Sequence, residues 1–185
     1  SKRLLEQFEG RRAPPIGAWQ HRTRMDTTAP DADGHVNPWV VTFSGHRPDE
    51  VGLREALCTL GNGYFATRGA LPEAVSDQVH HPGTYVAGIY NRLVTAVEGH
   101  EVENESLVNV PNWLALRFRP AGGAWIGDDT CEVLDHRLDL ELDRGALVRR
   151  SRFRDDQGRI TSVTQRRFVS LRHPHLAGLE TTLVA

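Results

Sequence analysis

The sequence has little of what would indicate a disulfide-stapled protein, a zinc protein or a membrane protein. Its 185 residues include two cysteines, Cys58 and Cys131, which make neither a disulfide framework nor a zinc-ligand spacing. No apolar run approaches the roughly 20 residues that cross a bilayer, so we expect no membrane partner. Because two isolated cysteines are typical of a reducing compartment, we expect buried free thiols and a cytoplasmic protein.

Lysine is also almost absent, since Lys2 is the one lysine among 22 basic residues. The 24 acidic residues leave a formal net charge of -2, and no nucleic-acid-binding motif accompanies the arginines. We therefore expect no nucleic-acid partner and attribute the arginine excess to a GC-rich genome. Residues 73–145 contain more acidic than basic side chains, and residues 146–185 contain more arginines than acidic side chains. We predict that these arginines pair with the acidic stretch 128–143, within one sheet or across to another domain.

A change of composition at Trp39 predicts two segments. Residues 1–38 combine a short amphipathic helix over 1–10 with a stretch rich in Pro, Asp, Thr and charge, which is typical of a linker or arm. Residues 39–185 alternate short apolar runs with Gly, Pro, Asn and Asp, which indicates an all-β antiparallel sandwich. The final residues, 179–185, form a strand pattern without a polar tail, so we expect the chain to be part of a longer protein.

Period-two alternation predicts the strands of this sandwich. The clearest example, residues 138–143, turns at Arg144 and Gly145 into the next strand, and a run of Asp, Gln and Gly at 155–158 makes a second turn. A break at residues 173–175 precedes the last strand. The other predicted strands are 39–44, 113–119, 146–154 and 159–171.

Three short segments carry candidate binding residues. The glycine-rich run 60–69 mounts Asn62, Tyr64 and Arg68 on a rigid turn, which is typical of an interface or a sugar site. A buried turn with a structural arginine explains the same residues equally well. Segment 80–91 repeats this chemistry, and segment 109–113 places amides beside an indole, a combination that suits hydroxyl-rich ligands. These two segments add the candidates Tyr85, Asn91, Asn112 and Trp113.

Two further patterns could indicate catalysis or metal binding, and we favour the simpler explanation for each. Glu101, Glu103 and Glu105 would share one face of a strand, as paired glycosidase carboxylates could, but a solvated edge or loop explains them better. The histidines at 80–81 and at 173 and 175 have no local third ligand. We therefore expect no metal ion and no catalytic residue in this chain.

Five segments in order resemble one known family. They are residues 54–64 with 68–69, residues 82–91, residues 109–113, residues 138–140 with 145–149, and residues 167–171 with 175–176. Together they resemble the N-terminal region of glycoside hydrolase family 65, which comprises maltose, trehalose and kojibiose phosphorylases and acid trehalases. The detailed sequence of these segments is most similar to that of the actinobacterial members, and the resemblance covers about residues 39–185.

The resemblance implies a large twisted β-sandwich of the galactose mutarotase-like super-sandwich type, followed in the family by a barrel of paired helices. In the family that barrel carries the general-acid glutamate and the phosphate site. It implies that this chain is a non-catalytic domain, inactive alone, that supports the barrel and assists dimerisation of an α-glucoside phosphorylase or hydrolase. No cofactor is implied, and inorganic phosphate would be a co-substrate of the parent enzyme acting on a disaccharide.

A different class of function also fits the sequence. The chain could be a self-sufficient carbohydrate-binding or protein-assembly module that holds sugar through Trp113, Tyr64 and Tyr90. Under the family resemblance, the candidate residues of the three binding segments would instead face the barrel or the mouth of its active site. Phosphorolysis and hydrolysis stay open, as does the disaccharide linkage.

Overall fold

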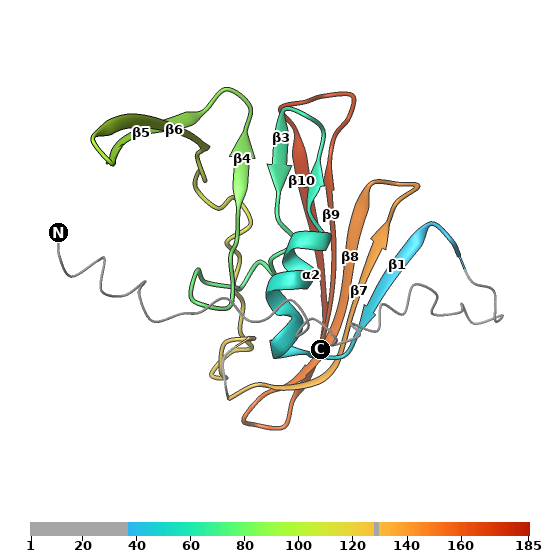
Figure 1. Ribbon diagram of the computed structural model, residues 1–185. Helices are drawn as coiled ribbons and strands as arrows, with labels where there is room; N and C mark the ends of the chain where they lie inside the picture. The colour runs from blue at the N-terminus through green and yellow to red at the C-terminus, as the bar shows by residue number, and fades with distance from the viewer. Residues whose placement is uncertain (1–36, 128–129) are drawn as a thin grey trace, which may run out of the picture.

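The computed structural model describes residues 37–127 and 130–185, so the predicted helix over residues 1–10 and most of the predicted linker lie outside the described residues. The described chain consists mainly of antiparallel strands in three sheets, with one α-helix (Figure 1). The predicted all-β antiparallel architecture is therefore confirmed. The elements, in chain order, are β1 (Val40–Ser44), the 3-10 turn η1 (Pro48–Glu50), α2 (Val51–Leu57), β2 (Leu60–Gly61), β3 (Phe65–Thr67), β4 (Thr84–Val86), β5 (Tyr90–Val97), β6 (His100–Leu107), β7 (Glu132–Glu141), β8 (Ala146–Arg154), β9 (Ile160–Val169) and β10 (Ala177–Val184).

The largest sheet has five strands in the order β1-β7-β8-β9-β10, and every neighbouring pair is antiparallel. The strands from β7 onward follow one another as a meander, as their alternation predicts. Gly145 and Gly158 adopt φ values of 58° and 78° in the first two turns, a backbone region that glycine enters without strain. The predicted hairpins are therefore present, and the predicted break at residues 173–175 lies in the connection to β10.

The two faces of this sheet differ in what covers them. We call the face that bears Leu138, Leu147 and Val163 the inner face, and the face that bears Arg150 and Arg166 the outer face. Helix α2 lies against the inner face, and the small sheet β2-β3-β4 lies beside it (Figure 1). The first core cluster between these layers comprises Phe43, Cys58, Leu60, Leu138, Leu147 and Val169. A second cluster, Ile126, Cys131, Phe153 and Val163, lies on the same face.

The loop after β3 approaches the end of helix α2 closely at Gly69. A Cβ atom there would lie 2.5 Å from the Cβ of Cys58 and 3.1 Å from its carbonyl oxygen, so no side chain fits. Both cysteines are buried and neither forms a disulfide within the described chain, as predicted from their spacing. Burial raises the pKa of the Cys58 thiol to about 11. Cys58 is therefore a neutral core residue at physiological pH.

Residues 51–57, for which the sequence predicted no element, form helix α2, because Pro48 starts a helical turn and Arg54 is held across the turn by Glu50, at 2.9 Å. One sequence-based expectation is wrong. Residues 113–119 are not a strand, although their alternation predicted one. The NH of Leu116 donates to the carbonyl of Pro72, and no strand pairs with this segment among the described residues.

The β5–β6 hairpin stands apart from the rest of the molecule (Figure 1), and all of its strand residues are exposed. Its register places Glu101, Glu103 and Glu105 on one face, with Arg92 opposite Glu105. The Arg92 Nε atom lies 3.1 Å from Glu105 and 3.4 Å from Glu103. These carboxylates are therefore solvated and partly paired with a cation.

Candidate functional site

The side chain of Asn62 makes hydrogen bonds to the backbone of two different segments. Its side-chain oxygen accepts hydrogen bonds from the NH groups of Tyr64 (3.0 Å) and Phe65 (2.8 Å), which close the turn between β2 and β3. Its amide nitrogen donates to the carbonyl oxygens of Ser170 (2.7 Å) and Pro174 (3.1 Å), in the connection between β9 and β10. The residue therefore ties the small sheet to the large one.

Tyr64 and Arg68, the next two predicted residues, lie at the two ends of β3. Tyr64 is 37% exposed, and its ring meets that of His175 edge-on at 4.3 Å. Arg68 is half-buried, and a Cβ at Gly83 would lie 2.8 Å from the Arg68 Cδ and 2.7 Å from the Tyr85 hydroxyl. Arg68 and Tyr85 thus pack over one glycine. The Arg68 Nε atom is buried without a hydrogen-bond partner in the described chain.

Asn112 and Trp113 take structural positions beside the same small sheet. The Trp113 indole NH donates to the Thr67 hydroxyl at 3.3 Å, and its ring lies 6.0 Å from that of Phe65. The Asn112 side chain accepts from the NH of Leu114 at 3.0 Å. Asn91, in contrast, is exposed on the projecting hairpin. The structure thus brings six of the seven predicted residues to the small sheet and its flanks, and contact with a substrate stays a prediction.

The inner face contains a buried charged network that the sequence did not predict as a unit. Both terminal nitrogens of Arg149 bind the Glu73 carboxylate, one of them at 2.7 Å. The same guanidinium donates to Ser151 (2.9 Å) and Gln165 (3.0 Å). Bidentate arginine–carboxylate pairs are among the stronger protein hydrogen bonds. This pair fastens the loop that carries Glu73 to the centre of the sheet.

The predicted charge pairing is right for Arg150 and Arg154 on the outer face and wrong for this network. Arg150 binds Asp139 at 2.7 Å and Arg154 binds Glu132 at 2.8 Å, both within the predicted stretch 128–143. Arg149 pairs with Glu73, which lies outside that stretch. Arg167 donates instead to the carbonyl of Ala70 at 3.0 Å. The sequence could not predict the Arg149–Glu73 contact, because the partner of Arg149 lies 76 residues away in a loop.

His136 is buried next to this network in its neutral form. Its Nδ1 lies 2.9 Å from the Ser151 hydroxyl, which already accepts a hydrogen bond from Arg149. The Ser151 hydroxyl thus contacts both the Arg149 guanidinium and the His136 ring. Burial first, and then the positive charge of Arg149, lower the pKa of His136 to about 3.

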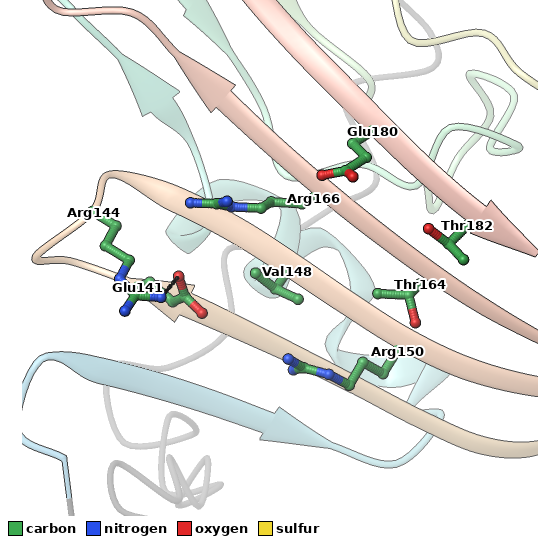
Figure 2. A pocket seen from close by; sticks show the side chains of 8 residues that line it. All are labelled: Glu141, Arg144, Val148, Arg150, Thr164, Arg166, Glu180 and Thr182. Atoms are coloured by element: carbon green, nitrogen blue, oxygen red, sulfur yellow. Dashed lines mark ion pairs between the residues drawn. The ribbon is translucent and has the colours of Figure 1, made fainter.

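A shallow hollow of about 250 Å³ lies on the outer face, over β7 to β10 (Figure 2). Figure 2 shows Val148 between the side chains of Arg166 and Arg150. Arg166 and Glu180 are register partners on β9 and β10, yet they form no ion pair within 4.0 Å. The lining comprises three arginines, two glutamates, two threonines and one valine: Glu141, Arg144, Val148, Arg150, Thr164, Arg166, Glu180 and Thr182.

A larger groove of about 630 Å³ adjoins the hollow and shares Glu141, Arg144 and Arg166 with it. Its other walls come from the edge of β2, the β7–β8 turn and the end of β9. Its most exposed apolar side chains are Leu142, Phe168 and Leu171. This surface could not be predicted from the sequence, because alternation within a strand does not show which strands lie side by side.

The described residues contain no group of three or more His, Cys, Asp or Glu side chains arranged to hold a metal ion. Within residues 37–127 and 130–185, no helix has both the length and the apolar character needed to span a membrane.

A family model described as "Glycosyl hydrolase family 65, N-terminal domain" matches residues 41–185. The chain is 47% identical over 169 residues to an uncharacterized glycosyl hydrolase of Mycobacterium tuberculosis, which covers 91% of this chain and 13% of that protein. It is 34% identical over 141 residues to a kojibiose phosphorylase of Caldanaerobacter subterraneus, covering 76% and 17% respectively. A trehalose 6-phosphate phosphorylase of Lactococcus lactis is 45% identical over 78 residues, or 40% of this chain and 10% of that protein.

The chain therefore spans less than a fifth of the length of these relatives. A solved structure described as a candidate kojibiose phosphorylase from the human microbiome superposes with a TM-score of 0.71 at 20% identity. That match covers 80% of this chain and 20% of the other, and it shows a shared fold.

Replacing Asn62 by Asp tests whether this residue holds the two sheets together. Asn62→Asp keeps the turn acceptor but removes the two donors and points a carboxylate at two carbonyl oxygens. We expect a loss of about 1–3 kcal/mol in the free energy of unfolding, measured by urea denaturation. The control Asn91→Asp, on the exposed hairpin, should change it by less than about 0.5 kcal/mol. Equal stability of the two variants would disprove the structural role of Asn62.

The buried neutral His136 predicts a specific pH dependence. Its folded pKa of about 3 lies below the ordinary value of 6.5, so the unfolded chain binds the proton more readily. Its contribution to stability is complete above pH 6.5 and is lost as the pH falls toward 3. Between these limits the wild type should lose up to about 1.4 kcal/mol more per pH unit than His136→Gln.

Urea denaturation at a series of pH values measures these slopes. His173→Gln, which removes an exposed histidine, is the control and should keep the wild-type slope. If His136→Gln also keeps that slope, His136 is not held neutral in the folded protein.

Proposed function

The chain belongs to glycosyl hydrolase family 65, as its N-terminal domain, and from this premise we propose that it is the non-catalytic β-domain of a phosphorylase or hydrolase acting on α-glucosides. The match of residues 41–185 to the N-terminal domain of the family carries this proposal. It agrees with the resemblance that the five sequence motifs indicated. Relatives named as kojibiose and trehalose 6-phosphate phosphorylases support a role in carbohydrate metabolism.

The acidic residues of the described chain support a non-catalytic role. Glycosidases need two carboxyl groups on either side of the scissile bond, one of them free to donate a proton. Here the buried carboxylates have structural partners, although Glu55, which accepts from the NH of His81, has one oxygen without a partner among the described residues. Glu73 binds Arg149, Asp139 binds Thr42 and Arg150, and Asp155 binds Arg159.

The reaction would therefore depend on residues of another domain, which we propose to be a helical barrel. In a phosphorylase, a general acid on that barrel would protonate the glycosidic oxygen while inorganic phosphate attacks the anomeric carbon from the opposite face. In a hydrolase, a water activated by a carboxylate base would replace phosphate. The β-domain would supply support and loops, and the small sheet with Arg68, Tyr85 and Trp113 is the surface we assign to the barrel.

The projecting hairpin supports an assembly role for the domain. A two-stranded hairpin is marginally stable by itself in water, and this one exposes Leu93, Val97 and Val102 on a single face. Contact with the barrel or with a second copy of the chain would cover them. Cys58 and Cys131 form no disulfide within the described chain, which supports a reducing location such as the cytoplasm.

An activity comparison tests the proposed function. The chain alone and a version extended to the length of its relatives are assayed on trehalose, maltose and kojibiose, with and without inorganic phosphate. We expect turnover from the extended protein and none from the chain alone, because the proton donor lies outside it. Phosphate-dependent turnover would identify a phosphorylase. Substantial turnover by the chain alone would overturn the non-catalytic assignment.

A further inference from the structure

We propose that the hollow on the outer face is a carbohydrate site, which binds one glucosyl unit of a glucoside. The inference rests on the proposed function for the choice of sugar and on the geometry of the hollow for everything else. None of the residues that the sequence motifs singled out as binding candidates lines this hollow.

Free donors and acceptors lie side by side in the hollow. Arg166 and Glu180 are cross-strand partners, and neither makes a hydrogen bond or an ion pair with another described residue. Thr164 and Thr182 form the next cross-strand pair and add two hydroxyl groups. Arg150 is bound to Asp139 through one terminal nitrogen and keeps further donors.

This mixture fits a neutral polyhydroxyl ligand better than an ion. A sugar hydroxyl donates one hydrogen bond and accepts others, so neighbouring hydroxyls can bridge the Arg166 guanidinium and the Glu180 carboxylate. The charges of the lining nearly balance, because Arg144 lies 3.6 Å from Glu141, Arg150 is bound to Asp139, and Arg166 is the register partner of Glu180. Neither a phosphate nor a cation would therefore find a large excess of opposite charge. Hydrogen bonds to charged groups are also stronger than those between neutral groups.

The volume of the hollow fits one sugar ring, and the adjoining groove would hold a second ring of the same glucoside. Drug-sized ligands occupy pockets of about 300–1,000 Å³, so a hollow of about 250 Å³ suits one hexose. Val148, between Arg150 and Arg166 (Figure 2), is 5% exposed, so a sugar there would contact mainly polar groups. The adjoining groove offers the ring of Phe168, which is 40% exposed and packs on Gly178.

Titration of the chain with glucosides tests this site. We expect trehalose, maltose or kojibiose to bind with millimolar affinity, followed by calorimetry and by chemical-shift changes at residues of β9 and β10. Arg166→Gln and Glu180→Gln preserve side-chain size and should each weaken binding about tenfold or more, because each removes hydrogen bonds to a charged group. Circular dichroism confirms that each variant is folded.

The matched control is Arg152→Gln, which removes an exposed arginine of the outer face that does not line the hollow. It should bind glucosides as the wild type does. The absence of glucoside binding, or binding that Arg166→Gln leaves unchanged, overturns the proposal. So does inorganic phosphate that displaces the sugar, since an anion site would then explain the arginines. Turnover is measured on the extended protein and glucoside binding on the chain alone. Failure of the proposed hollow site and failure of the proposed function are therefore distinguishable.

Discussion

The buried ion pair between Arg149 and Glu73 is the contact on which the two-layer arrangement depends. Arg149 sits at the centre of the inner face with its side chain 4% exposed, and Glu73 reaches it from the loop after β3 with 10% exposed. A charge so buried is costly without its partner. The guanidinium also donates to Ser151, and its positive charge adds to burial, the larger cause, in lowering the pKa of His136. One pair therefore holds the loop in place and connects it to the polar core.

The two faces of the large sheet consequently have different roles. On the inner face, Arg149 and Arg167 satisfy their donors within the protein and hold the loop of residues 68–73 in place. On the outer face, Arg166 and Glu180 stay free beside two threonines. Unpaired polar groups on a rigid sheet are preorganised for a ligand, since their backbone positions are already fixed. The proposed carbohydrate site follows from this difference.

Local patterns predicted the meander from β7 to β10 because alternation and turn residues act over short distances. They failed for residues 113–119, where a backbone hydrogen bond to Pro72 replaces strand pairing. They gave no indication of α2, which η1 and the Glu50–Arg54 contact stabilise. Asn62 was identified, but its partners at Ser170 and Pro174 lie more than 100 residues away. The outer hollow was missed for the same reason, because it exists only through the register of four strands.

A double-mutant cycle on Arg149 and Glu73 tests the central claim most directly. Urea denaturation of Glu73→Gln, Arg149→Met and the double variant gives the coupling free energy between the two side chains. We expect each single change to cost about 3–5 kcal/mol, because it leaves a buried group without its partner, and the double variant to lose much less than the sum. Losses that add to within about 0.5 kcal/mol would show that the pair is not coupled and would contradict the account.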